Sequence, residues 1–187
     1  MVVNMSRPVR RFVAIAHEIA WCTLGTVDTS GRPRSRVVHP VWEELADGGL
    51  TGWLTTRSST PKLGHVAATP YVSCSYWWEK HDVAVAECRA RVVGDPGERE
   101  RVWALVAATP PPAGFDPATI WPGGPQDPGF TLVRMDPWLL RFARADELAA
   151  GGAPEVLRLS GANDPPGLQE LHRSPLHVRG AEYPPSP

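Results

Sequence analysis

The stretch Trp53-Leu-Thr-Thr-Arg-Ser-Ser-Thr-Pro-Lys62 sets the order strand, tight loop, helix from which the rest of the fold can be read. The helix begins at Thr60-Pro61, with Thr as the N-cap and Pro at the first helical position. The free N–H groups and partial positive charge of a helix start favour an anion. Hydroxyl groups, Arg57 and Lys62 add donors and charge, so the stretch indicates a phosphate site. On the local pattern alone, a capped helix with solvated polar side chains explains it as well.

The preceding strand-like run, residues 32–42, adds a second feature. With the period-two alternation of a strand, its side chains divide into two sets. One face carries Arg34, Arg36, Val38 and Pro40, and the other carries Ser35, Val37 and His39. A row of arginines beside apolar residues suits a ligand with a flat ring at one end and an anion at the other. The alternative is a rim strand with exposed arginines.

Hydrophobic periodicity predicts six strands and three helices along the chain. The predicted strands are residues 22–27, 33–42, 50–56, 71–78, 83–93 and 130–142, the last interrupted at Pro137. The predicted helices are residues 9–20, the segment from Thr60-Pro61 to before Pro70, and residues 95–108, where Asp95-Pro96 repeats the pattern of a cap followed by proline. Because most of the strands are joined by short turns, we expect a mainly β fold with a few helices, a six-stranded antiparallel barrel.

Composition limits the partners and the compartment. The 187 residues hold 19 basic and 20 acidic side chains, for a net charge of −1, so we expect neither a nucleic-acid nor a membrane partner. Three cysteines without C-x-x-C spacing indicate buried free thiols, no metal site and a cytoplasmic protein.

Proline is unevenly distributed. Of the 21 prolines, seven fall in residues 109–129 and seven in residues 151–187. We therefore predict one domain at 1–150, a Pro/Gly-rich insertion at 109–129 and a Pro-rich C-terminal tail at 151–187. Because long loops in compact domains are usually functional or disordered, we expect the insertion, with Trp121, to border the binding site.

The order and spacing of these elements resemble the FMN-binding split-barrel superfamily, the pyridoxamine 5′-phosphate oxidase-like proteins. The motifs that carry the resemblance are Leu24-Gly-Thr-Val, residues 33–42, Trp53-Leu-Thr-Thr with Lys62, Val72-Ser-Cys-Ser-Tyr-Trp77 and residues 86–93. The resemblance runs from about Val9 to Phe142. It implies a homodimer that holds the flavin in a groove between subunits.

The resemblance also implies three groups of cofactor contacts. The residues expected along the isoalloxazine ring are Arg36, Val37, Val38 and His39. Those expected at its pyrimidine edge and ribityl chain are Leu54, Thr55 and Thr56. Those expected at the phosphate are Ser59, Thr60 and Lys62. Hydride chemistry belongs to such a cofactor, so no catalytic side chain is assigned.

The function implied is that of a flavin-binding oxidoreductase acting on a small organic molecule. Residues 151–187 lack the Arg- and Trp-rich substrate motif of the vitamin-salvage oxidase, so pyridoxamine phosphate is not the expected substrate. One alternative is a reductase that uses a deazaflavin coenzyme of the F-420 type, whose longer acidic tail would need further basic residues. Candidates for that tail are Arg7, Arg10, Arg11 and Arg57. The other alternative is a non-catalytic split barrel that binds flavin or haem.

Overall fold

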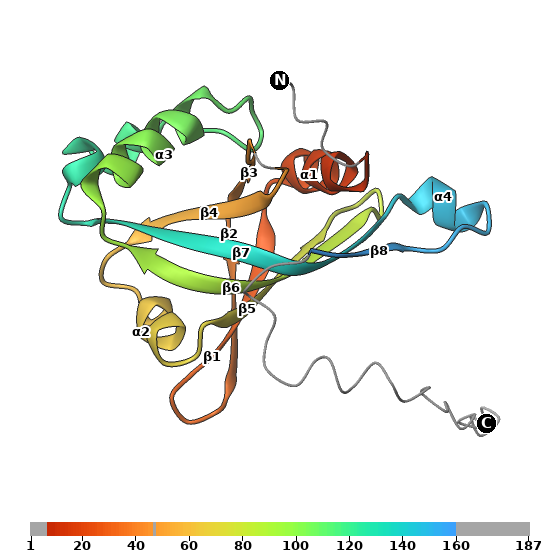
Figure 1. Cartoon of the computed structure of the whole chain (residues 1–187), viewed down its shortest axis with the longest axis horizontal. Helices are drawn as coiled ribbons and strands as arrows, with labels where there is room; N and C mark the ends of the chain where they lie inside the picture. The colour runs from red at the N-terminus through yellow and green to blue at the C-terminus, as the bar shows by residue number, and fades with distance from the viewer. Residues whose placement is uncertain (1–6, 47, 160–187) are drawn as a thin grey trace.

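The computed structural model describes residues 7–46 and 48–159, which form one antiparallel sheet with helices packed around it (Figure 1). The strands are β1 (Cys22–Val27), β2 (Pro33–Val38), β3 (Val41–Glu44), β4 (Leu50–Arg57), β5 (Tyr71–Trp77), β6 (Val83–Val93), β7 (Phe130–Ala143) and β8 (Glu155–Arg158). The helices are α1 (Arg7–Ile19), α2 (Pro61–Ala68), α3 (Pro96–Ala108) and α4 (Ala145–Ala149), with two short 3-10 helices, η1 (Pro117–Thr119) and η2 (Gly124–Gln126). The mainly β, antiparallel architecture is as predicted.

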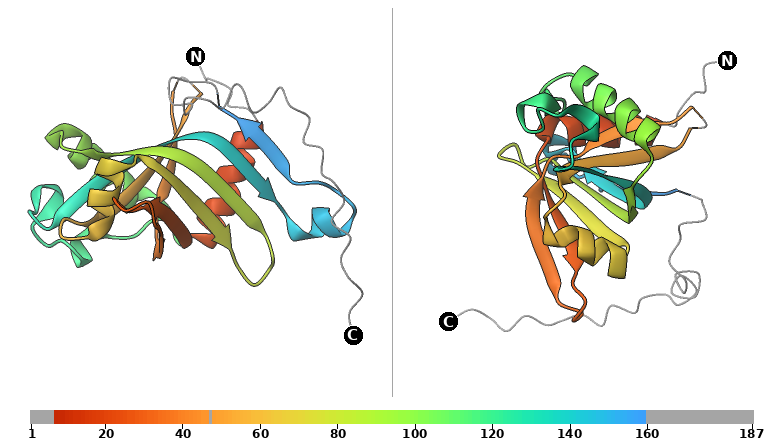
Figure 2. Two further views of the ribbon diagram at one scale, coloured as in Figure 1. Left: turned by 90° about the horizontal axis from the view of Figure 1, so that it is seen from below. Right: turned by 90° about the vertical axis from the view of Figure 1, so that its left-hand side faces the viewer.

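The sheet rolls up because its two edges are neighbours in the chain. Its strand order is β2-β1-β5-β6-β7-β4-β3, and β8 pairs with β7. The edge strands β2 and β3 are joined by only two residues, His39 and Pro40. A sheet whose opposite edges are connected so closely has to curl, and Figure 2 shows the resulting roll. Among the described strands β2 and β3 are not paired with each other, so the barrel stays split.

The predicted number of six strands was too low, because the structure describes eight. The run 33–42, predicted as one strand, divides at His39-Pro40 into β2 and β3. Proline has no N–H to donate to a ladder and restricts the residue before it, so the strand ends there. The eighth strand, β8, lies within residues 151–187, which were predicted to form a tail. Residues 160–187 lie outside the described residues.

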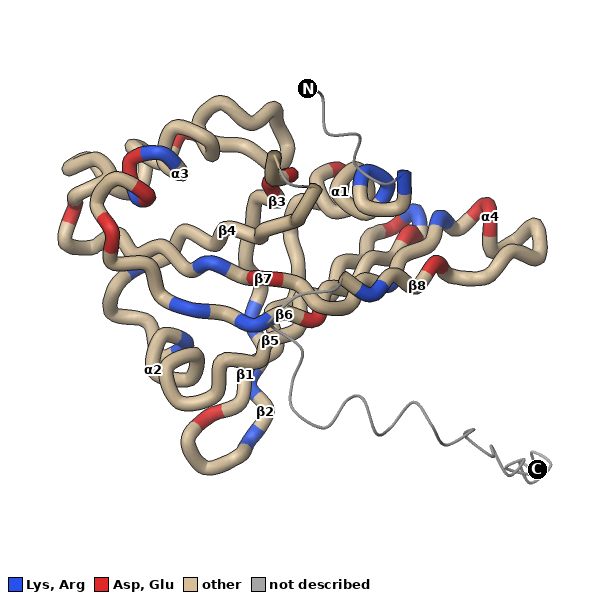
Figure 3. The backbone as a smooth tube through the Cα atoms, viewed as in Figure 1, with Lys and Arg blue, Asp and Glu red and all other residues tan. Residues whose placement is uncertain are grey.

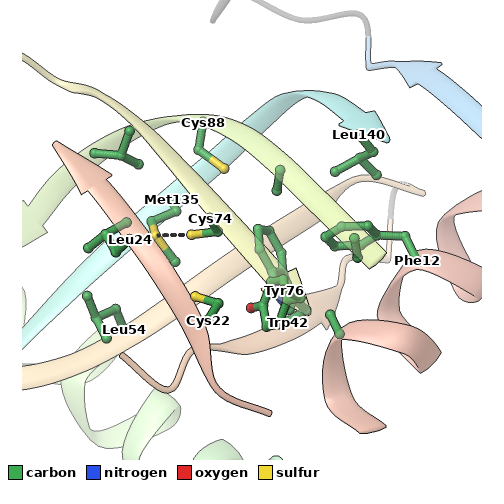
Figure 4. Close-up of a cluster of buried hydrophobic side chains, with 14 of the residues drawn as sticks. Phe12, Cys22, Leu24, Trp42, Leu54, Cys74, Tyr76, Cys88, Met135 and Leu140 are labelled. Carbon is green, nitrogen blue, oxygen red and sulfur yellow. Dashed lines mark hydrogen bonds between the residues drawn. The ribbon is translucent and has the colours of Figure 1, made fainter. Parts of the chain in front are cut away.

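Apolar side chains from opposite sides of the roll fill its interior (Figure 4). Phe12 of α1 packs edge-on against Trp42, with ring centroids 5.1 Å apart. The predicted free thiols are confirmed: the three cysteines are buried and unpaired. They lie in the interior on β1, β5 and β6. The hydrogen bond with Cys22, and then burial, raise the pKa of Cys74, and burial raises the pKa of Cys88.

Helix α3 covers a second, smaller core on the outside of the roll. Asp95 caps it as predicted, because its side chain accepts a hydrogen bond from the Glu98 N–H at 2.7 Å. Val102 and Val106 are fully buried and pack with Trp53 and Phe130. This second core joins α3 to the segment between α3 and β7.

Strand β7 runs through Pro137 without the predicted interruption. Instead, the register between β6 and β7 shifts between Glu87 and Cys88, and Cys88 pairs with Pro137. A bulge at this point accommodates a residue that cannot donate to the ladder.

Among the described residues, no helix is long and apolar enough to cross a lipid bilayer.

Candidate functional site

A cavity of about 550 Å³ lies between β2, β4, α2 and the segment that follows α3. Its lining residues are Trp21, Val37, Val38, His39, Leu54, Thr55, Thr56, Lys62, Pro111, Pro112, Gly114, Phe115, Ile120 and Trp121. Of the ten residues predicted to contact a cofactor, seven lie here: Val37, Val38, His39, Leu54, Thr55, Thr56 and Lys62. Its size is within the ordinary range for small-molecule sites.

Thr55, Thr56 and Lys62 form the polar end of the cavity. Lys62 Nζ donates a hydrogen bond to Thr56 Oγ1 at 2.7 Å. Burial, and then the positive charge of Arg36, lower the pKa of Lys62. No carboxylate lines the cavity, and within the described residues neither Lys62 nor Arg36 forms an ion pair. Figure 3 shows the basic position on α2 close to those on β2. An ammonium group held without a counter-ion suits an incoming anion.

The arginines of β2 lie outside this cavity. Arg36 Nη1 donates to Thr26 Oγ1 at 2.7 Å and to the Leu24 carbonyl at 3.1 Å. Thr26 Oγ1 also lies 3.0 Å from His65 Nδ1 of α2. Arg34 forms an ion pair with Asp28, at 3.0 Å. Val37 and Val38 at the end of β2 and the following His39 line the cavity, whereas Arg36 does not.

Two more predicted residues, Ser59 and Thr60, are not among the lining residues. Thr60 is the N-cap of α2 and Pro61 follows it, as predicted, but the Thr60 side chain makes no capping hydrogen bond. Its Oγ1 donates to the Arg57 carbonyl at 3.0 Å. The N–H groups at the start of α2 therefore have no side-chain cap at Thr60 to accept from them.

Trp21, His39, Phe115 and Trp121 form the aromatic end of the cavity. The His39 ring lies between Trp21 and Phe115, with centroid distances of 4.8 and 5.3 Å. Burial lowers the pKa of His39, although the nearby carbonyls of Pro112 and Ala113 act in the opposite direction. His39 Nε2 is buried without a hydrogen-bond partner among the described residues. The lowered pKa and the buried, unpartnered nitrogen both favour the neutral imidazole, and no described Lys, Arg, Asp or Glu lies at the aromatic end.

The insertion at 109–129 is tied firmly to the barrel beside this end. Trp121 is buried, packs edge-on against Phe130 at 5.0 Å and donates from Nε1 to the Gly129 carbonyl at 3.1 Å. Arg99 of α3 donates to the carbonyls of Pro125, Asp127 and Phe130 at 2.9, 3.3 and 3.2 Å. In Figure 2 the short helices η1 and η2 lie at the same end of the molecule as α2. The insertion thus forms a fixed wall of the cavity.

Sequence reasoning pointed to this insertion and to Trp121 but missed six lining residues: Trp21, Pro111, Pro112, Gly114, Phe115 and Ile120. The available signal was the presence of aromatic and apolar side chains in a segment otherwise rich in Pro and Gly. Trp21 gave no signal, because a tryptophan just before a strand is ordinary.

The histidines do not form a metal centre in the described part of the chain. No group of three or more His, Cys, Asp or Glu residues there could hold a metal ion. His17 Nε2 accepts a hydrogen bond from the Trp42 N–H at 2.9 Å. Burial, and then His39, lower the pKa of His17 to about 4. His17 and His65 therefore serve as hydrogen-bonding partners inside the fold.

The cavity is amphipathic, with a cation and two hydroxyls at one end and rings at the other. This donor set fits a ligand that joins a phosphate to a planar ring, as FMN does. The family model for pyridoxamine 5′-phosphate oxidase matches residues 9–142 of the chain. The chain belongs to this family. No curated protein sequence is significantly similar to it.

Solved structures of the pyridoxamine 5′-phosphate oxidase family share the fold. General stress protein 26 from Bacillus anthracis is 18% identical, with a TM-score of 0.58 over 81% of this chain and 98% of that one. A pyridoxamine 5′-phosphate oxidase-related, FMN-binding protein from Nostoc punctiforme is 12% identical, with a TM-score of 0.55 over 85% and 100%. The haem storage protein HutZ from Vibrio cholerae is 19% identical, with a TM-score of 0.53 over 72% and 91%. At such identities the likeness establishes the split-barrel fold.

Proposed function

We propose that this protein is an FMN-binding oxidoreductase that acts on a small organic molecule. The observation that carries the proposal is the placing of Lys62, without a counter-ion in the described residues, at one end of a cavity whose other end is aromatic. A phosphate monoester supplies the negative charge that this lysine lacks. Planar rings stack well on aromatic side chains such as those at the other end.

In this proposal the chain binds and orients, and the cofactor carries the electrons. Lys62 and Thr56 bind the phosphate, with Arg36 adding positive charge behind them. Leu54 and Thr55 line the same cavity and would contact the ribityl chain and the pyrimidine edge. Bound FMN would supply hydride transfer. The aromatic end excludes water from the ring, which strengthens every hydrogen bond made there.

FMN is preferred over the deazaflavin coenzyme because of where the candidate arginines lie. Arg11 forms ion pairs with Glu147 and Glu155, at the α4–β8 end of the molecule. Arg7 and Arg10 lie on the same helix, α1, which packs against β3, β5, β6, β7 and β8 rather than against α2. Only Arg57 adjoins the polar end in sequence. This number of cations suits a single phosphate better than a longer acidic tail.

A homodimer also belongs to this proposal, with the flavin near the contact between subunits. A cytoplasmic location stays a prediction from the free cysteines.

Titration of the purified protein with FMN, riboflavin and the deazaflavin coenzyme tests the proposal. We expect FMN to bind at least about tenfold more tightly than riboflavin, because a charge-assisted contact to phosphate contributes about 1.5 to 3 kcal/mol. Equal affinity for FMN and riboflavin would contradict the phosphate assignment. Tighter binding of the deazaflavin would favour the alternative reductase.

A further inference from the structure

Three large apolar side chains stand exposed around the mouth of the cavity. Trp21 is 59% exposed, Val37 67% and Ile120 43%, and all three line the cavity. They come from the turn before β1, from β2 and from the insertion, and we call them the apolar rim. Exposed apolar side chains that converge on one opening from separate segments mark a binding surface.

The charges around the cavity are as informative as the rim. Lys62 is the only Lys, Arg, Asp or Glu among the described residues that line the cavity. The one other described lining residue that could carry a charge is His39, and its pKa is lowered. Arg36, whose positive charge acts on Lys62, is not among the lining residues. A ligand phosphate that occupies this end would use the cationic site of the cavity. A second anionic ligand at the rim would then have no cation to pair with, and burying an unpaired charge is costly.

The rim is held in place rather than left to adapt. Ile120 directly precedes Trp121, which the second core anchors against Phe130. Arg99 fixes the far end of the insertion through three backbone carbonyls. A wall fixed in this way selects ligands by shape and polarity, because it cannot rearrange to supply new polar partners.

We infer that the apolar rim binds an uncharged, planar and largely apolar molecule beside the cofactor. This inference rests on the proposed function for the occupant of the polar end, and it names the substrate class of the same site. A phosphorylated or carboxylated substrate is disfavoured at the rim.

Two isosteric probes separate charge from shape: 2-naphthamide, which is neutral, and 2-naphthoate, which is anionic at pH 7.5. Calorimetry of the FMN-loaded protein should give at least about tenfold tighter binding of the amide, the cost of an unpaired charge at the rim. The same titration in phosphate buffer without FMN occupies Lys62 with inorganic phosphate. The preference for the amide should persist in phosphate buffer. A failure of FMN to bind would therefore refute the proposed function, while the preference of the apolar rim would still be measured.

Matched variants locate the binding. Trp21→Ala should abolish the binding of the amide, whereas Trp77→Ala should not, although Trp77 is just as exposed at 63%. Ile120→Glu should weaken it, whereas Val156→Glu, at a position 58% exposed on β8, should leave it unchanged. Equal or tighter binding of the naphthoate would overturn the inference, as would equal losses in Trp21→Ala and Trp77→Ala. It would also be overturned if neither probe binds and Ile120→Glu converts a dimer to a monomer in light scattering, because the rim would then be a contact between copies.

Discussion

At the polar end of the cavity, Thr55, Thr56 and Lys62 come from one stretch of sequence, whereas the aromatic end draws Trp21, His39 and Phe115 from three distant segments. The polar end is a strand, a tight loop and the first turn of a helix, so its geometry is nearly local. The aromatic end exists only when the insertion folds back on the barrel. The polar end is therefore local in sequence, whereas the aromatic wall depends on the whole fold.

Acid is expected to destabilise the fold mainly through His17, which is buried in the interior beside Trp42. The pKa of His17 is lowered from 6.5 to about 4 in the folded protein, so between these values the unfolded chain binds more protons than the folded one. The contribution of His17 to the free energy of unfolding is therefore fully present above pH 6.5, and it is lost as the pH falls toward 4. The loss should be about 2 to 3 kcal/mol in the free energy of unfolding. Urea unfolding at several pH values in this range measures it.

The control for this prediction is His17→Gln, which keeps an acceptor for the Trp42 N–H but cannot titrate. Its stability should depend less on pH across the same range. Some dependence should remain, because burial also lowers the pKa of His39. Asp28 accepts a hydrogen bond from the Arg32 N–H, which lowers the pKa of Asp28. The stability that depends on Asp28 is therefore lost at a more acidic pH than the stability that depends on His17. An unchanged slope in His17→Gln would contradict the assignment.

Adding one methyl group should disrupt the insertion. A Cβ at Gly114 would lie 1.7 Å from the Thr109 carbonyl oxygen, so Gly114→Ala forces the backbone to move. We expect a loss of about 2 kcal/mol in stability, typical of overpacking, and weaker binding at the aromatic end. Thermal unfolding and quenching of tryptophan fluorescence by FMN would show both. A variant as stable as the parent would mean that the insertion is not fixed.

Removing the lysine should weaken the polar end and leave the aromatic end unchanged. Lys62→Ala is expected to lower FMN affinity by about 10- to 100-fold, the value of a charge-assisted contact. Riboflavin affinity should not change, since riboflavin has no phosphate. Fluorescence titration with both ligands measures the difference.

The matched control is Lys80→Ala, at the only other lysine in the chain. Lys80 lies over the Trp78 ring and 3.6 Å from Glu18, away from the cavity. FMN affinity should stay the same in this variant. If both alanine variants lose affinity equally, the effect is general electrostatics rather than a contact with Lys62.

The smallest effect is expected from adding a methyl group at Gly64, in helix α2 beside the polar end. A Cβ at Gly64, inside α2, would meet no atom within 4 Å. Gly64→Ala should raise stability by about 0.5 to 1 kcal/mol through higher helix propensity. FMN affinity should be unchanged. A destabilised variant would show that α2 needs the flexibility of glycine next to the phosphate site.

Particular residues show what could be predicted from the pattern alone. Most of the strands, the Asp95 cap and the Pro61 helix start follow from local periodicity and capping, and the structure confirms them, whereas the break at His39-Pro40 and strand β8 were not predicted. Arg36, predicted along the isoalloxazine ring, is not among the lining residues, and its guanidinium donates to Thr26 and to the Leu24 carbonyl. Alternation told which residues share a face of β2, but Val37 and Val38, from opposite faces, both line the cavity.

The sequence by itself determined most of the helices and strands, the antiparallel class and the polar stretch 53–62, because each depends on neighbours a few residues apart. Tertiary structure alone decided that His39-Pro40 is a corner between the two sheet edges, and that the insertion lies against β2. Those outcomes depend on which surfaces bury each other, and burial acts between segments that the chain separates. For that reason the polar end of the cavity could be predicted from the sequence, whereas most of the residues at its aromatic end could not.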